Sequence, residues 1–136
     1  MVAICFDDGA VGSSADSTSM RIINAIANEG FRATFFYVGN WINSTDKENE
    51  VKYAYSKGME IANHSTSHPD LTTKSASEYD TTQQKLRDII GAEPAALMRL
   101  PYFACNSAVQ SALSDVSLIT CSIDTQDWNG AASEQI

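Results

Sequence analysis

The sequence predicts an α/β fold with a mainly parallel β-sheet. Short apolar runs alternate with amphipathic helical patterns along the chain, and a polar cluster directly follows four of these runs. Strand–helix alternation is typical of α/β domains, whose ligand sites lie at the carboxyl ends of the parallel strands. The chain has 136 residues, fewer than the roughly 200 of a closed barrel. We therefore expect one α/β domain that is incomplete and lacks its last strand–helix units.

Five short apolar runs predict the strands. The first run ends at an Asp-Asp-Gly sequence, the pattern of a buried strand that carries polar residues to its C-terminal end. In chain order, the predicted strands are residues 2–6, 32–39, 59–63, 95–100 and 117–123.

Apolar residues at helical spacing between these runs predict the helices. In the first helix, Asp16 or Ser17 is the expected N-cap and Gly30 the expected C-terminal stop. In the third helix, Ser75 and Glu78 match a capping box, in which each side chain bonds the backbone N–H of the other residue. The later helices are predicted over residues 46–57, 76–90 and 106–114, and residues 132–136 resemble the start of another.

The composition excludes several classes of function. The formal net charge of -8 offers nothing to replace counterions on a phosphate backbone, so neither nucleic acid nor an anionic membrane is an expected partner. No apolar run reaches the roughly 18 residues of a membrane span, and no signal peptide is visible. Cys5, Cys105 and Cys121 lack Cys-x-x-Cys spacing, which disfavours a thiolate zinc site, and we expect all three to be buried.

The sequence Phe-Asp-Asp-Gly at residues 6–9 places two adjacent carboxylates at the end of a strand. Like charges this close raise the pKa of one carboxyl group unless a cation offsets the repulsion, although the same sequence also suits an ordinary turn. Arg99, before the turn that Pro101 fixes, could hold one carboxylate by a bidentate pair. The alternative for Arg99 is a purely structural salt bridge.

The sequence Asn-His-Ser-Thr-Ser-His at residues 63–68 contains the only two histidines of the chain. A helical metalloprotease motif requires a glutamate between them, whereas here the insert is Ser-Thr-Ser and Pro69 follows, which disfavours that class. A loop could still aim both imidazoles at one point, and either Asp7 or Asp8 could complete a three-ligand site open to water. The alternative is a solvated surface loop.

Two further polar stretches follow the last two predicted strands. Tyr102, in Arg-Leu-Pro-Tyr, could lend a backbone N–H to an oxyanion or its ring to a sugar, and it could equally be a core aromatic. Trp128, in the sequence Asp-Thr-Gln-Asp-Trp from residue 124, would suit the wall of a carbohydrate groove because an indole face packs on a pyranose. Its alternative is also core packing.

Taken in order, the stretches FDDG, HSTSH, RLPY and DTQDW resemble the first four motifs of the polysaccharide deacetylase superfamily. This is the NodB homology domain, or carbohydrate esterase family four, and the resemblance is greatest to its acetylxylan esterases. It covers nearly all of the chain and implies a distorted (β/α) barrel that binds a divalent metal, Zn²⁺ or Co²⁺, and deacetylates polysaccharides. Residues 1–136 are then expected to be the NodB-like catalytic domain, truncated at its C-terminus.

The resemblance implies a role for each matching residue in the first two motifs. Asp8, His64 and His68 match the metal ligands, and Asp7 matches the catalytic base. A Lewis-acidic metal makes water acidic near neutral pH, so a carboxylate such as Asp7 can accept its proton before the acetyl carbonyl is attacked.

The third and fourth motifs imply four further roles. Arg99 matches the residue that orients the base, and Tyr102 matches the residue whose N–H helps to form the oxyanion hole. Asp127 matches an acid that tunes a later histidine, and Trp128 matches the indole that lines the groove. The family commonly has Thr, Pro and Pro where this chain has Cys5, Ala10 and Leu100.

A fifth family motif, Leu-x-His, has no counterpart after His68, so we expect a truncated enzyme. The stretch DTQDWN looks most like the acetylxylan esterases of the family, so we expect it to remove O-acetyl groups from xylan. The first alternative is an N-deacetylase of chitin or peptidoglycan, and the second is an inactive metal-binding fragment that only holds carbohydrate. The expected partner is an acetylated polysaccharide. Because such a polymer is too large to enter a cell, we expect the protein to be secreted.

Overall fold

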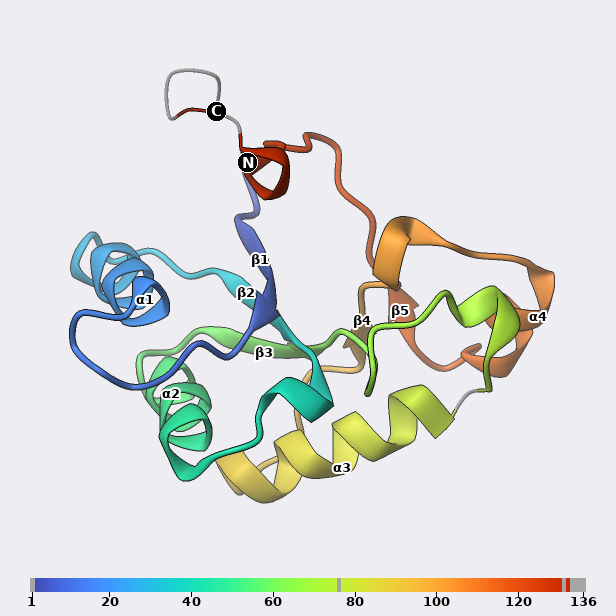
Figure 1. Cartoon of the computed structure of the whole chain (residues 1–136), viewed down its shortest axis with the longest axis horizontal. Coiled ribbons are helices and arrows are strands. Elements are labelled where there is room, and N and C mark those ends of the chain that lie inside the picture. Colours follow the sequence, from blue (N-terminus) through green and yellow to red (C-terminus); the bar gives the residue numbers. More distant parts are fainter. Residues whose placement is uncertain (1, 76, 131, 133–136) are drawn as a thin grey trace.

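Five strands form one parallel sheet in the order β1-β2-β3-β4-β5, as a computed structural model describing residues 2–75, 77–130 and 132 shows (Figure 1). The strands are β1 (Cys5–Gly9), β2 (Thr34–Tyr37), β3 (Glu60–Asn63), β4 (Leu97–Met98) and β5 (Ser117–Leu118). Each strand pairs in parallel with the next one along the chain. The predicted α/β class with a parallel sheet is confirmed.

The helices lie around the outside of the sheet and follow one another in chain order (Figure 1). The α-helices described are α1 (Thr18–Asn28), α2 (Thr45–Ser56), α3 (Ser77–Ile90) and α4 (Ser107–Ala112). Four short 3₁₀ turns are described in the segments that follow β2, β3, β4 and β5: η1 (Gly39–Trp41), η2 (Leu71–Thr73), η3 (Pro101–Phe103) and η4 (Asp127–Asn129). Within the described ranges, no helix is both long and apolar enough to cross a membrane.

The main core lies between the sheet and the first three helices. Ile23 of α1, Val51 of α2 and Leu86 of α3 are fully buried in one cluster with strand residues that include Phe35 and Tyr37. Burying such side chains contributes about 1.5–3 kcal/mol each. A smaller cluster under η2 and α4 contains Leu71, Met98, Leu100, Val109 and Leu113. The two clusters fix the strands whose ends carry the polar motifs.

Several predicted strand bounds are wrong. β1 begins at Cys5 and continues through Asp7 and Asp8, whereas the sequence placed these acids after the strand. β4 and β5 each have only two residues. β4 stops because Pro101 fixes the following turn, and β5 stops because residues 120–130 are all exposed and no core supports a longer extended segment.

Other local predictions are also wrong. Glu78 does not form the predicted capping box, because its carboxylate accepts hydrogen bonds from Thr66 and Ser67 of the histidine loop. Cys105 and Cys121 are exposed and Cys5 is only half-buried. The helix start predicted over residues 132–136 lies outside the described residues except for Ala132, which is not helical.

Glu50 of α2 is a fully buried carboxylate that holds the loop after β1. Its Oε2 accepts hydrogen bonds from the N–H groups of Val11 and Gly12, at 2.8 and 2.6 Å. Burial raises the pKa of Glu50, and these hydrogen bonds, with one from Ser19, offset the effect in part. The helix thus anchors the segment that leaves the end of β1.

The raised pKa of Glu50 predicts a specific dependence of stability on pH. A carboxyl group whose folded-state pKa exceeds its ordinary 4.5 contributes stability that is fully present below pH 4.5 and is lost as pH rises through the folded-state pKa. Glu50→Gln keeps the shape and cannot ionise. We expect the free energy of unfolding of the unmutated protein to fall relative to that of Glu50→Gln as pH rises.

Urea unfolding of both proteins, at pH steps from below 4.5 to neutrality, measures this difference. Glu48→Gln on the same helix is the matched control, because Glu48 is only partly buried. A stability difference between the unmutated protein and Glu50→Gln that stays constant with pH would contradict the prediction.

Candidate metal centre

Polar side chains from three strands meet at the carboxyl edge of the sheet. Asp8 lies near the end of β1, His64 directly follows β3, and Arg99 directly follows β4. The ends are tied together by backbone hydrogen bonds of 3.0 Å, from His64 N–H to the Tyr37 carbonyl and from Arg99 N–H to the Asn63 carbonyl. The structure thus brings the first three sequence clusters to one place.

A bulge in β1 lets Asp7 and Asp8 both act at this edge. Successive residues of a regular strand point to opposite faces of the sheet. Here the pairing register shifts between Phe6 and Gly9, and Asp8 has a left-handed φ of 63°. Gly9 is required because a Cβ there would lie 2.5 Å from the Tyr37 ring. Asp8 consequently turns toward the histidines while Asp7 reaches Arg99.

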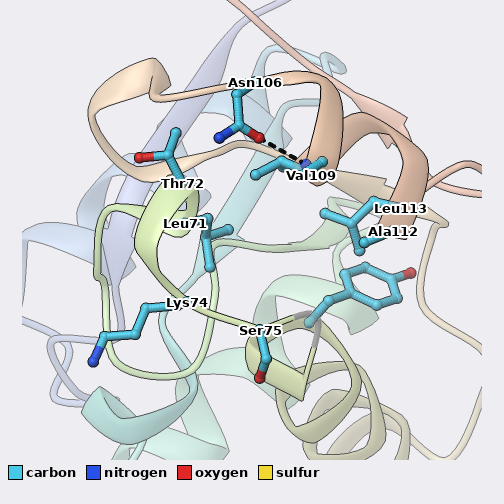
Figure 2. Close-up of a pocket in the computed structure, with 10 residues that line it drawn as sticks. Leu71, Thr72, Lys74, Ser75, Asn106, Val109, Ala112 and Leu113 are labelled. Carbon is cyan, nitrogen blue, oxygen red and sulfur yellow. Dashed lines mark hydrogen bonds between the residues drawn. The ribbon is translucent and has the colours of Figure 1, made fainter.

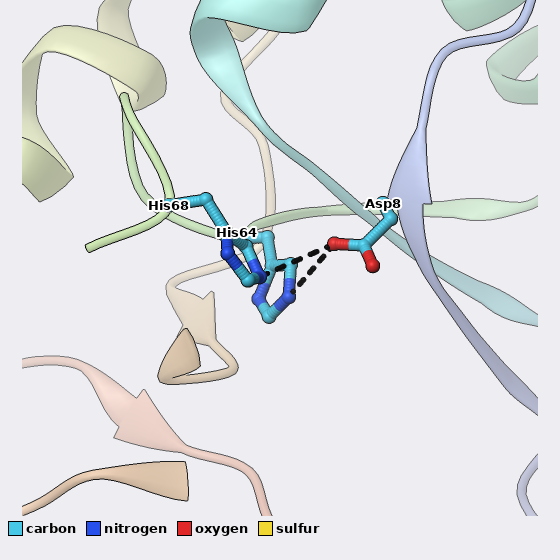
Figure 3. A group of neighbouring side chains, drawn as sticks. All are labelled: Asp8, His64 and His68. Carbon is cyan, nitrogen blue, oxygen red and sulfur yellow. Dashed lines mark ion pairs between the residues drawn. The ribbon is translucent and has the colours of Figure 1, made fainter. Parts of the chain in front are cut away.

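The side chains of Asp8, His64 and His68 converge on one point (Figure 3). Asp8 Oδ1 lies 3.3 Å from His64 Nε2 and 3.4 Å from His68 Nε2. One ligand atom from each residue lies within 4.8 Å of the other two. The aspartate comes from β1 and the imidazoles approach it from the loop after β3, and the Asp8 side chain is 51% exposed.

The hydrogen bond of His64 to the sheet selects its tautomer. His64 is 4% exposed, and its Nδ1 lies 2.8 Å from the Arg99 carbonyl oxygen. Because a carbonyl can only accept, Nδ1 carries the proton, and Nε2 is left to face the Asp8 carboxylate. In this orientation the Nε2 lone pair is directed at the position that a cation would share with Asp8.

The electrostatics of the group suit a cation. The neighbouring imidazoles, His64 first and then His68, lower the pKa of Asp8 despite its partial burial. Burial and the neighbouring His64 lower the pKa of His68, which favours its neutral form. Metal binding requires an ionised carboxylate and neutral imidazoles. Two imidazole nitrogens and one carboxylate oxygen therefore fit a divalent ion such as Zn²⁺ or Co²⁺.

His68 lies between two aromatic rings. The indole of Trp41 stacks on it with the ring centroids 5.5 Å apart, and the ring of Tyr102 contacts it edge-on at 4.9 Å. Trp41 is 38% exposed and Tyr102 is 71% exposed. Sequence reasoning missed Trp41, which lies in η1 shortly after β2. The end of β2 was the only early strand end without a candidate residue, and this gap was the one signal that could have pointed to Trp41.

Arg99 holds Asp7 but does not form the bidentate pair that the sequence suggested. Its Nη1 donates to Asp7 Oδ1 at 2.8 Å, while Nε and Nη2 donate to the carbonyls of Ile119 and Thr120 at 3.4 Å. The guanidinium also packs over the Phe36 ring, 4.5 Å from its centroid. Because Nε and Nη2 donate to the segment after β5, Arg99 makes only one hydrogen bond to Asp7.

Asp127 and Trp128 do not join the group. Both lie in η4, which Figure 1 shows beyond the amino end of β1 and away from the carboxyl ends of the strands. Asp127 accepts a hydrogen bond from the hydroxyl of Thr125, and Trp128 is 75% exposed, with its indole N–H directed at Asp124.

The backbone is strained at several residues of the group. Asp8, His68, Tyr102 and Phe103 have φ values of 63°, 58°, 57° and 53°. Non-glycine residues seldom adopt this left-handed region, and those that do are concentrated at functional sites. These backbone conformations depend on local geometry, which the hydrophobic periodicity of the sequence does not predict.

A separate hollow of about 200 Å³ lies between η2, the start of α3 and α4 (Figure 2). Its wall includes Leu71, Val109 and Leu113 with a polar rim at Lys74. Asn106 beside it caps α4 by accepting a hydrogen bond from the Val109 N–H at 2.9 Å. None of the residues of the metal-ligating group lines this hollow.

Comparison with known proteins identifies the family. A family model for polysaccharide deacetylases matches residues 1–119. The chain belongs to the polysaccharide deacetylase family. Among solved structures, the family 4 carbohydrate esterase from Streptomyces lividans matches with a TM-score of 0.83 and 32% identity, over 98% of this chain and 69% of that one.

Curated polysaccharide deacetylases that are named for different substrates are similar to the chain. The peptidoglycan-N-acetylglucosamine deacetylase PgdA of Listeria monocytogenes is 31% identical over 93% of this chain. The bifunctional xylanase/xylan deacetylase of Cellvibrio japonicus is 32% identical over 99% of it. The match covers 26% of the first relative and 20% of the second, so this chain spans about a quarter or less of their lengths.

The stacking of Trp41 on His68 predicts an optical signal for metal binding. Co²⁺ is paramagnetic and would lie next to the imidazole that touches the indole, so its addition should quench the emission of Trp41. The measurement is tryptophan fluorescence during titration with Co²⁺. The chain has two tryptophans, so Trp128→Phe should retain the quenching and Trp41→Phe should lose it.

His64→Ala supplies a further control, because it removes a proposed ligand without touching the Trp41 stack. Quenching that persists in His64→Ala would contradict binding at this group.

Proposed function

We propose that this chain is a metal-dependent hydrolase that removes acetyl groups from a polysaccharide, with O-acetylated xylan as its substrate. The observation that carries the proposal is the group formed by Asp8, His64 and His68, with a second carboxylate, Asp7, held beside it by Arg99. Membership of the polysaccharide deacetylase family and the activities for which the relatives are named support it.

In this proposal Asp8, His64 and His68 hold a divalent cation, Zn²⁺ or Co²⁺. Three protein ligands leave room for water or substrate, as in catalytic zinc sites. The bound cation would supply a Lewis acid that makes water acidic near neutral pH and polarises a carbonyl group. Arg99 and Trp41 contribute indirectly by fixing the orientations of the two imidazole rings.

Asp7 is the proposed general base. It is next to Asp8 in the chain, and the Arg99 guanidinium occupies its Oδ1, which leaves Oδ2 to accept a proton from water. The resulting hydroxide adds to the acetyl carbonyl carbon, the carbon–oxygen bond to the sugar breaks, and acetate leaves while the sugar oxygen gains a proton. The Tyr102 N–H is the proposed donor to the oxyanion that forms during this addition.

Aromatic side chains beside the group are the proposed sugar contacts. Tyr102 and Trp41 flank His68 and expose their rings, and ring faces of this kind pack on the apolar face of a pyranose. Trp128 is the groove residue that the family resemblance implies, with Asp127 tuning a histidine. Both roles require η4 to approach the carboxyl ends of the strands, and Figure 1 shows it away from them.

One observation favours an ester over an amide as the substrate: the stretch DTQDWN resembles the acetylxylan esterases of the family. Removal of N-acetyl groups from chitin or peptidoglycan is the second candidate, favoured by the Listeria relative. Because each of these substrates is a large polymer, we propose that the protein acts outside the cell.

Acetate release from acetylated xylan is the deciding measurement. We expect release in the presence of Zn²⁺ or Co²⁺ and its loss after chelation. Chitin oligomers and N-acetylated peptidoglycan form the parallel assay, and faster release from them would replace xylan with an N-acetylated polymer. A metal-loaded protein that binds these polymers but releases acetate from none would instead be a carbohydrate-binding fragment, and would refute the proposed activity.

Asp7→Asn separates the base from the ligands. The amide keeps the shape of the side chain but cannot accept a proton from water, so we expect acetate release to fall by about 10²–10⁴-fold. The metal content, measured by elemental analysis after dialysis, should stay unchanged because Asp7 is not among the three converging ligands. Loss of metal from Asp7→Asn would show that the roles of Asp7 and Asp8 are exchanged.

A further inference from the structure

We propose that Glu78 is a positioning residue of the metal centre, because its carboxylate holds the loop that sets His68 relative to His64. This inference rests on the proposed metal site. Glu78 lies in the first turn of α3, outside the strand ends that carry the motifs, and it touches none of the three ligands.

The carboxylate of Glu78 binds the insert between the two histidines. Its Oε2 accepts hydrogen bonds from the N–H groups of Thr66 and Ser67 at 3.0 and 2.8 Å. Its Oε1 accepts from the Ser67 hydroxyl at 2.9 Å. Hydrogen bonds to an ionised acceptor are about twice as strong as those between neutral groups. One side chain therefore fixes two consecutive peptide units of the loop.

Thr82 extends this contact along the same face of α3. It lies one turn after Glu78, and its hydroxyl donates to the Ser65 carbonyl at 3.0 Å. The Thr66 hydroxyl donates to the Glu78 carbonyl at 2.8 Å and lies 3.0 Å from the Thr82 hydroxyl. The Ser-Thr-Ser insert, which the sequence could not distinguish from a solvated turn, is thus bound to the helix at each residue.

The loop needs this support because its backbone is strained at both ends. Ser65 and His68 have φ values of 70° and 58°, in a region that costs about 1–3 kcal/mol for non-glycine residues when nothing compensates. The Ser65 hydroxyl accepts the His68 N–H at 3.0 Å, which links the two strained residues. Fixing the peptide units between them keeps His68 in the orientation that reaches Asp8.

The effect of Glu78 should fall on His68 more than on His64. His64 is held independently by the Tyr37 and Arg99 carbonyls, which belong to the sheet. His68 depends on the loop and on its aromatic neighbours. Loosening the loop would therefore change the spacing between the two Nε2 atoms and weaken cation binding, while the Asp7–Arg99 pair would stay in place.

Glu78→Gln tests this role. The amide keeps one acceptor oxygen but directs an N–H group at the donors of the loop. We expect the Kd for Co²⁺ to rise by about 10-fold or more, the range seen when residues that orient metal ligands are lost. The measurement is a Co²⁺ absorption titration of the folded, metal-free chain, at a temperature well below its Tm.

Asp80→Asn is the matched control, because Asp80 is an exposed acid in the same first turn of α3. Both variants lose one negative charge at the helix N-terminus, with the same cost to the helix dipole, but only Glu78 binds the loop. Asp80→Asn should keep the original Kd. Thr82→Val, which removes the second support, should also raise the Kd and replaces Glu78→Gln if that variant fails to fold.

The outcomes separate the inference from the metal site on which it rests. A lower Tm in Glu78→Gln with an unchanged Kd for Co²⁺ would mean that Glu78 is merely structural, and would overturn the inference alone. Failure of the unmutated chain to bind Co²⁺ would overturn the metal site and the role of Glu78 together. A raised Kd in Glu78→Gln and Thr82→Val, but not in Asp80→Asn, supports the inference.

Discussion

The site depends on one buried cation, the guanidinium of Arg99. Its donors bind Asp7 of β1 and two carbonyls after β5, its plane covers Phe36 of β2, and its own carbonyl fixes the tautomer of His64 after β3. A buried charge is costly unless its donors are satisfied, so these partners are held at the distances that satisfy it. One residue therefore contacts four other strands or the segments that follow them. Its side chain orients the proposed base and its backbone carbonyl orients a proposed ligand.

Around this centre, two helices bind the loops that the sheet leaves unsupported. Glu50 of α2 binds the segment after β1, and Glu78 of α3 binds the segment after β3. In both cases a carboxylate accepts two consecutive backbone N–H groups of a loop, which compensates for peptide groups that no strand pairs. The acids differ in environment, since Glu50 is fully buried with a raised pKa and Glu78 lies closer to solvent. The rigidity of the site is thus supplied from outside the strand ends.

Sequence patterns predicted a mainly parallel sheet and the convergence of polar clusters at its strand ends, because apolar runs indicate which segments are strands and therefore where their ends lie. The choice of Asp8 over Asp7 as the partner of His64 and His68 came from the family resemblance alone. They could not predict what depends on local turns. The bulge that turns Asp8 away from its neighbour leaves no periodic signal, and Trp41 follows β2 without a recognisable motif. The sequence predicted a capping role for Glu78, whereas its carboxylate binds the histidine loop. The two roles have the same local sequence, so the pattern around Glu78 could not distinguish them. Asp127 and Trp128 lie in an exposed segment, and their side-chain hydrogen bonds are to Thr125 and Asp124 of the same segment.

The left-handed backbone at Asp8 and His68 limits which substitutions these two positions can accept during evolution. Asp, Asn and His are the side chains that tolerate this conformation best after glycine, so a neutral replacement at either position is most easily Asn. Such a change removes a charge or an imidazole while the turn keeps its shape. Homologues that are no longer selected for catalysis could therefore keep this fold and its surface after they lose the residues of the cation site. At these positions, a substitution can remove a proposed metal ligand without straining the backbone.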